Sequence, residues 1–201
     1  AKVQPFIMTI GTLTLYRGIA LLISDGKPVY MDPSTADTVK FLGDGRILNV
    51  PTQVIVLIII AALMAFLLNK TVFGRYIKAI GGNQEAARVA GINIDRYKTA
   101  AYVMSGVLAA AAGVVLTART TTGDPTLGQS YEMDAIAACV IGGTKLTGGV
   151  GTIVGTVIGA FIIGIVNNIL NLTNISTYYQ YVVRGGIIIL AVVFNSMECK
   201  K

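Results

Sequence analysis

Long apolar runs separated by short polar segments make up most of this 201-residue chain. A helix that crosses the hydrocarbon core of a bilayer needs about 20 mostly apolar residues. Five runs meet or approach that length: 6–24, 54–68 with Pro51 and Thr52 at its start, 99–118, 151–170 and 178–194. A sixth run, 133–144, is too short to span alone and ends in glycines, which is typical of a half-helix or a broken span. The pattern predicts an all-α fold, a polytopic transmembrane helix bundle of about five full spans plus one short or broken helix.

Two polar segments interrupt the apolar runs. Residues 25–50 have Asp, Gly, Pro and Ser spread through them without helical periodicity, so we interpret them as a long loop, with a lid or a docking surface as alternatives. Residues 70–98 contain GGNQEAARVAGINIDRYK. In that stretch Asn83 is a good N-cap, Glu85 lies in the first turn, and Gly91 suits the C′ position. These signals predict a helix of about seven residues, or roughly two turns.

This short predicted helix has one face of small residues. Ala86 and Ala90 share that face with Val89 beside them, while Arg88 points nearly opposite to Ala86. The helix lacks the Trp, Phe or Leu side chains that anchor an amphipathic helix in a membrane surface. We therefore expect a groove of another protein to receive it.

The charged residues are few and unevenly distributed. Because 54% of the residues are hydrophobic and only 13% are charged, a bilayer is a better solvent for the chain than water. If the N-terminus is cytosolic and each run crosses once, the cytosolic side receives ten of the 16 lysines and arginines, namely Lys2, Lys70, Arg75, Lys78, Arg88, Arg96, Lys98, Lys145, Lys200 and Lys201. This bias predicts that both termini and residues 70–98 are cytosolic and that residues 25–50 form an outer loop. It also accounts for the net charge of +6 without a nucleic-acid partner.

Glycines inside one apolar run predict close helix packing. In GTIVGTVIGAFIIG, Gly151, Gly155 and Gly159 recur every fourth residue, which places them on one helix face. The preceding GGTKLTGGVG has the spacing of neither a phosphate-binding loop nor a dinucleotide-binding fingerprint.

Polar groups at membrane depth are costly to bury and are functional candidates by default. The candidates for a translocation pathway are Arg17, Glu132, Asp134 and Asn167, with Asn168, Asn171 and Arg184 as further polar positions in or near the runs. The alternative is that the acidic pair and Arg184 only anchor helix ends, and that Arg17 only packs.

No pattern of catalytic or metal-binding residues is visible. The chain has no histidine, and Cys139 and Cys199 form neither a metal-binding nor a disulfide pattern. A Ser–His pair or a comparable cluster is also missing. We therefore expect no catalytic residue, no metal site and no bound cofactor, and the chain is not expected to be an enzyme.

The stretch EAARVAG, residues 85–91, resembles the coupling-loop pattern Glu-Ala-Ala, three residues, Gly in the membrane subunits of bacterial ABC importers. Its surroundings, GRYIKAIGGNQEAARVAGINIDR, are similar to the version found in permeases for simple sugars of the ribose and galactose/methyl-galactoside class. The blocks YEMDAIAACVIGGTKLTGGVGTIVGTVIGA, PFIMTIGTLTLYRG and YYQYVVRGGIIILAV are also similar to these permeases, so the resemblance covers essentially the whole chain.

The resemblance implies a subunit of the bacterial cytoplasmic (inner) membrane that works as a homodimer or a paired permease. Its implied partners are a cytosolic ABC ATPase and an extracytoplasmic sugar-binding protein. It assigns ATPase coupling to Glu85, Ala86, Ala87 and Gly91, and the helix geometry adds Asn83 and Arg88. Residues 70–98 are accordingly named the coupling segment.

Under this resemblance, residues 1–201 form a single transmembrane permease domain that matches the C-terminal part of the family's usual length. Such permeases have further spans ahead of the position that matches Ala1, so a natural truncation or a fragment is expected. Two alternatives remain: a channel or secondary transporter outside the ABC class, and an inactive truncated permease. The first alternative predicts ion-pathway charges deep in several spans.

Overall fold

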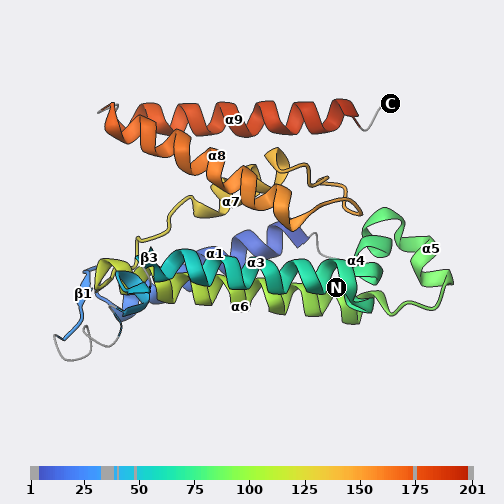
Figure 1. Cartoon of the computed structure of the whole chain (residues 1–201), viewed down its shortest axis with the longest axis horizontal. Coiled ribbons are helices and arrows are strands. Elements are labelled where there is room, and N and C mark those ends of the chain that lie inside the picture. Colours follow the sequence, from blue (N-terminus) through green and yellow to red (C-terminus); the bar gives the residue numbers. More distant parts are fainter. Residues whose placement is uncertain (1–4, 33–38, 40, 48, 174–175, 199–201) are drawn as a thin grey trace. The chain divides into compact units, whose positions relative to one another are not determined.

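The computed structural model describes residues 5–32, 39, 41–47, 49–173 and 176–198, and most of these are helical (Figure 1). Five helices correspond to the five long apolar runs: α1 (Pro5–Ile23), α3 (Thr52–Lys70), α6 (Ile94–Thr120), α8 (Ile153–Leu172) and α9 (Thr177–Glu198). The short run forms α7 (Tyr131–Ile141). The predicted all-α fold class is therefore confirmed. Cys199, Lys2, Lys40, Lys200 and Lys201 lie outside the described residues.

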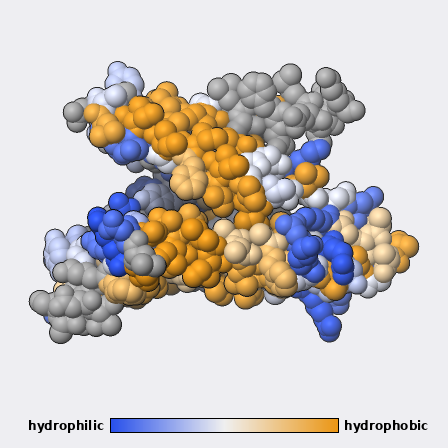
Figure 2. Space-filling model, viewed as in Figure 1, coloured by the Kyte–Doolittle hydropathy of each residue, from blue (hydrophilic) through white to orange (hydrophobic). Residues whose placement is uncertain are grey.

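The long helices expose much of their apolar surface. Among the described residues, α3, α6 and α8 are long and apolar enough to cross a membrane, and α1 is apolar over Ile7–Ile23. Ile58 on α3 is 60% exposed and Phe161 on α8 is 59% exposed. Figure 2 shows hydrophobic residues over the long helices and hydrophilic residues around the segment between α3 and α6. Apolar exposure on this scale is typical of helices that contact lipid or other proteins. The full number of crossings stays a prediction.

The chain forms two compact units, of which the first comprises Ala1–Val56 and Val107–Gln129. Within it, β1 (Val29–Tyr30) pairs antiparallel with β4 (Thr122–Gly123), and β2 (Arg46–Ile47) pairs with β3 (Val50–Pro51). The β1 and β4 pairing ties part of the predicted outer loop to the end of α6. The loop interpretation therefore needs one addition, because short strands occur within residues 25–50.

A turn follows β4 directly. The carboxylate of Asp124 accepts hydrogen bonds from the backbone N–H of Thr126, at 2.8 Å, and from the hydroxyl of Thr126, at 2.7 Å. The hydroxyl contact first, and the backbone contact second, lower the pKa of the Asp124 carboxyl from its ordinary value. The turn is therefore stabilised above the ordinary carboxyl pKa, and this contribution is lost as the pH falls through the lowered pKa.

The second unit comprises Leu57–Gly106 and Ser130–Lys201. It contains two short helices that follow α3, namely α4 (Val72–Gly82) and α5 (Gln84–Val89). It also contains α7, which packs against both α8 and α9. The small core beside α7 consists of Ala137, Ala138 and Ile163, with Ile141 and Ile187 packed against it. The second unit thus holds the coupling segment and most of the other predicted site residues.

Candidate functional site

The predicted short helix of the coupling segment is α5, and its caps are those expected from the sequence. The backbone N–H of Ala86 donates to Oδ1 of the N-cap residue Asn83 across 3.0 Å. Glu85 lies in the first turn. Gly91 has a φ of +80°, the left-handed conformation that glycine adopts readily after a helix end. The N-cap and C′ predictions are confirmed.

We expect a Gly91→Ala substitution to loosen the end of α5. A Cβ atom in the left-handed region costs roughly 1–2 kcal/mol. Nothing lies within 4 Å of a Cβ added at Gly91, so the cost is conformational and not steric. Amide hydrogen exchange of residues 84–92 should be faster in this variant. Gly91→Asn is the control, because asparagine tolerates the left-handed region; equal exchange in both variants would contradict the conformational explanation.

The helix α5 has an inward and an outward face. Ala87 is 4% exposed and forms a buried cluster with Ile80 of α4 and Ile94 of α6. Ala86 and Ala90 are exposed, and Val89 is 89% exposed. Of the residues assigned to coupling, Ala87 thus packs α5 against its neighbours, whereas Ala86 lies on the outward face. The two adjacent alanines of the motif therefore differ in burial, because Ala87 is packed and Ala86 is exposed.

Charged and polar side chains around α5 make weak surface contacts. Arg88 and Glu85 form an ion pair of 3.6 Å, and both side chains are largely exposed. Nζ of Lys98 donates to Oε1 of Gln84 across 2.9 Å. Exposed ion pairs contribute about 0.3–0.5 kcal/mol on a helix. These contacts can therefore rearrange at little cost when another protein approaches.

A hollow of about 430 Å³ lies next to the C-terminal end of α5. Its lining includes Phe73 and Tyr76 of α4, Gly91, and Arg96 and Tyr97 of α6. The rings of Tyr76 and Tyr97 meet edge to face with centroids 5.1 Å apart. Sequence reasoning missed this hollow, because its two walls come from helices on either side of α5.

Among the candidates for a translocation pathway, the structure brings Asp134 and Asn167 together. Nδ2 of Asn167 on α8 donates to Oδ2 of Asp134 on α7 across 3.2 Å, and the contact is partly buried. Gln180 of α9 adds a further polar link, because its Nε2 donates to Oδ1 of Asn171 on α8 across 3.0 Å. Gln180 is only 8% exposed. It was missed by sequence reasoning, although a lone amide among the aromatic and apolar residues of YYQYVV was a visible signal.

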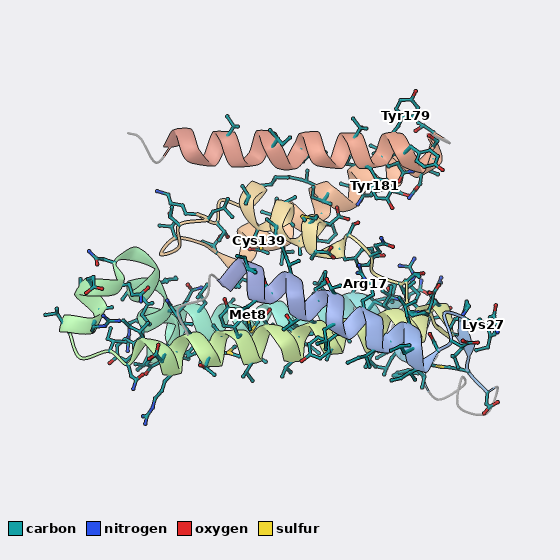
Figure 3. All side chains as sticks on the ribbon, turned by 180° about the vertical axis from the view of Figure 1, so that it is seen from behind. Met8, Arg17, Lys27, Cys139, Tyr179 and Tyr181 are labelled. Atoms are coloured by element: carbon teal, nitrogen blue, oxygen red, sulfur yellow. The ribbon has the colours of Figure 1, made fainter. Side chains whose placement is uncertain are left out.

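The other two candidates are not part of this group. Glu132 is half-buried in the first turn of α7. Arg17 is half-buried on α1, in the first compact unit (Figure 3). Neither side chain makes a hydrogen bond or an ion pair with another residue that the structure describes. Arg184 lies on α9.

A double-mutant cycle on Asp134→Ala and Asn167→Ala measures the link between α7 and α8. We expect the two effects on the free energy of unfolding to be non-additive by about 1 kcal/mol, because each substitution removes the same hydrogen bond. Unfolding of the two single variants and the double variant in detergent supplies the numbers. Asn168→Ala, at an exposed position of the same helix, is the control and should change little. Strict additivity would mean that this bond contributes nothing.

The three glycines predicted to pack on one helix face do not all lie on that face. A Cβ atom added to Gly155 would overlap the carbonyl oxygen of Gly142, and one added to Gly159 would overlap that of Ala138. Both therefore lie directly against the backbone at the end of α7. Gly151 precedes α8, because Thr152 caps the helix by accepting from the N–H of Gly155 at 3.1 Å. Gly151 instead approaches the side chain of Thr144, so it is not on the helix face that the spacing predicted.

The described residues contain no group of three or more His, Cys, Asp or Glu that could hold a metal ion. Cys139 on α7 is a free, half-buried thiol. Within the described residues, the predicted sites consist of the exposed face of α5 and of polar contacts between helices.

Comparisons with known proteins cover nearly all of the chain. A family model described as "Branched-chain amino acid transport system / permease component" matches residues 1–192. The chain is 45% identical over 196 residues to the ribose import permease protein of Haemophilus influenzae, which covers 97% of this chain and 61% of that protein. It is 42% identical over 199 residues to the L-arabinose transport system permease protein of Escherichia coli, covering 99% of this chain and 60% of that protein. The chain thus spans about three fifths of the length of these relatives. No solved structure matches it.

Proposed function

The chain belongs to the family of permease components of transport systems, and from this premise we propose that it is the transmembrane permease subunit of an ATP-driven ABC importer for a simple sugar. The observation that carries the proposal is the outward face of α5, where Ala86 and Val89 stand exposed on a helix whose other side is packed. An exposed face of small and apolar residues beside a hollow suits a groove in another protein.

The partner at this face is the cytosolic ABC ATPase. The ATPase binds and hydrolyses ATP, and this chain supplies no step of that chemistry. Closure and opening of the ATPase move α5, and α5 passes the movement to the spanning helices, so that the pathway opens alternately to each side. Asn83, Glu85, Arg88 and Gly91 support this role by shaping and flanking α5, and the hollow near Gly91 receives part of the ATPase.

The sugar enters from an extracytoplasmic binding protein that docks on the outer segments, including residues 25–50. Relatives of this chain are named for ribose and L-arabinose, which supports a monosaccharide of the ribose or galactose class as cargo. Asp134 and Asn167, with Glu132 and Arg17, are the polar groups that we assign to the pathway. They offer hydrogen bonds to hydroxyl groups among helices whose residues are mostly apolar.

The subunit lies in the bacterial cytoplasmic (inner) membrane. About five full spans and α7, as a broken span, each cross the membrane once. The excess of lysine and arginine supports a cytosolic position for the coupling segment and for both ends of the chain. A second copy or a paired permease is the further partner that we assign to the chain within the membrane, as the resemblance to sugar-importer permeases implies.

The test is reconstitution of the chain with a monosaccharide-importer ATPase and its binding protein in proteoliposomes. We expect the ATPase to co-purify with the tagged chain, and uptake of labelled ribose, L-arabinose or galactose to require both ATP and the binding protein. Uptake driven by an ion gradient without ATP would instead support a secondary transporter. Co-purification without any uptake would overturn the transport role of this chain while leaving the docking role in place.

A further inference from the structure

The last turn of α4 touches a loop that lies far away in the sequence. A Cβ atom added to Gly81 would overlap the backbone nitrogen of Gly149. In the reverse direction, a Cβ added to Gly149 would lie 2.9 Å from the Cα atom of Gly82, and one added to Gly148 would lie 3.0 Å from the Cα atom of Gly81. The two backbones are thus in direct contact, and only glycine permits an approach this close.

The loop in this contact is a closed turn that joins α7 to α8. The N–H of Lys145 donates to the carbonyl of Val150, and the N–H of Gly148 donates to the carbonyl of Lys145, both at 3.0 Å. At the α7 end, the N–H of Thr144 donates to the carbonyl of Cys139, also at 3.0 Å. Hydrogen bonds therefore hold the loop together and attach it to α7.

The opposite side of the contact belongs to the coupling segment. Ile80, the residue before Gly81, packs against Ala87 of α5 in the buried cluster. The N–H of Asn83 donates to the carbonyl of Ala79 across 3.0 Å, which fixes α5 to the end of α4. In the last turn of α4, Ile80 therefore packs against α5, and the next residue, Gly81, contacts the loop.

We infer that Gly81, Gly148 and Gly149 form a mechanical link, here named the glycine clasp, which transmits the movement of α5 to the α7 and α8 pair. Gly81 is its positioning residue. Rigid elements in direct contact transmit displacement, and α7 and α8 carry the bonded pair Asp134 and Asn167. The inference rests on the proposed function, because it concerns how an ATPase bound at α5 drives the pathway.

The test replaces Gly81 with Ala in the reconstituted transporter. The added methyl group collides with Gly149 and separates the clasp, while the outward face of α5 remains intact. We expect the ATPase to co-purify as before and to hydrolyse ATP at a rate within about twofold of the wild type, while sugar uptake per ATP hydrolysed falls about tenfold. The readout is this coupling ratio, which a general loss of folded protein does not change.

Gly82→Ala is the matched control, because a Cβ added at that neighbouring position meets nothing within 4 Å. It should retain the wild-type ratio. A second variant inserts two glycines after Leu146, which lengthens the loop without adding a side chain and should lower the ratio in the same way. This variant tests the clasp even where Gly81→Ala fails to fold.

The outcomes separate two failures. If the wild-type chain shows no ATP-dependent uptake, the proposed function fails. If the wild type transports and both clasp variants keep its coupling ratio, the glycine clasp is overturned while the proposed function stands. An equal loss in Gly81→Ala and Gly82→Ala would also overturn the clasp, because it would trace the effect to helix propensity and not to the contact.

Discussion

An Ala86→Trp substitution is expected to abolish ATP-driven sugar uptake while leaving the chain inserted in the membrane. Ala86 is exposed on the outward face of α5, and its replacement does not disturb the buried contacts of Ala87. A Trp side chain is too bulky for the ATPase groove in which we propose that α5 docks. Loss of a central docking contact costs about 2 kcal/mol or more, which is roughly 30-fold in affinity. Co-purification of the ATPase and uptake in proteoliposomes measure the two consequences.

Thr99→Trp is the matched control, because it adds the same bulk at an exposed position of α6 outside the outward face of α5. It should transport like the wild type. Ala87→Trp gives a useful contrast: Ala87 is 4% exposed, so bulk there should disturb the packing of α5 and lower stability as well as uptake. Normal ATPase binding and uptake in Ala86→Trp would end the assignment of α5 as the coupling helix.

Hydrophobic run length was sufficient to predict the long helices. The run 6–24 appears as Pro5–Ile23, and the run from Thr52 to Leu68 appears as Thr52–Lys70. The reason is that an unbroken apolar run of span length has only one low-energy backbone in lipid, the helix, in which every N–H and C=O is bonded. The helix caps were equally predictable, because the roles of Asn83 and Gly91 depend only on residues within one helical turn.

The helix α4 was missed although its signal is present in the sequence. Phe73, Tyr76, Ile77 and Ile80 follow the i, i+3, i+4, i+7 spacing of one helix face. Thr71 caps the helix, with its hydroxyl accepting from the N–H of Gly74. This helix does not stand out as a membrane span, because its opposite face is charged. An amphipathic helix of 11 residues is found by its periodicity and not by its mean hydropathy.

Contacts between segments that are distant in the chain could not be predicted from the sequence. Asp134 and Asn167 were each selected for the cost of burying a polar group, but nothing in either neighbourhood indicates that they bond to each other. The same holds for Gly81 and Gly149, because a glycine at a close approach looks like a glycine in a flexible loop. Which residue contacts which depends on how whole helices cross, and local helix propensity does not specify that crossing.

The crossing of α7 and α8 leads to the second large effect: a Gly159→Leu substitution is expected to prevent these two helices from packing. A Cβ at Gly159 already overlaps the carbonyl oxygen of Ala138, and backbone cannot move aside as the end of a side chain can. Overpacking costs about 1–3 kcal/mol and more where the backbone must shift, so the melting temperature in detergent should fall by roughly 6 °C or more.

Gly164→Leu is the control on the same helix, because a Cβ there meets nothing within 4 Å. Equal melting temperatures for the two variants would mean that α7 and α8 do not cross at Gly159, and the route from the glycine clasp to Asp134 and Asn167 would then lose its rigid element.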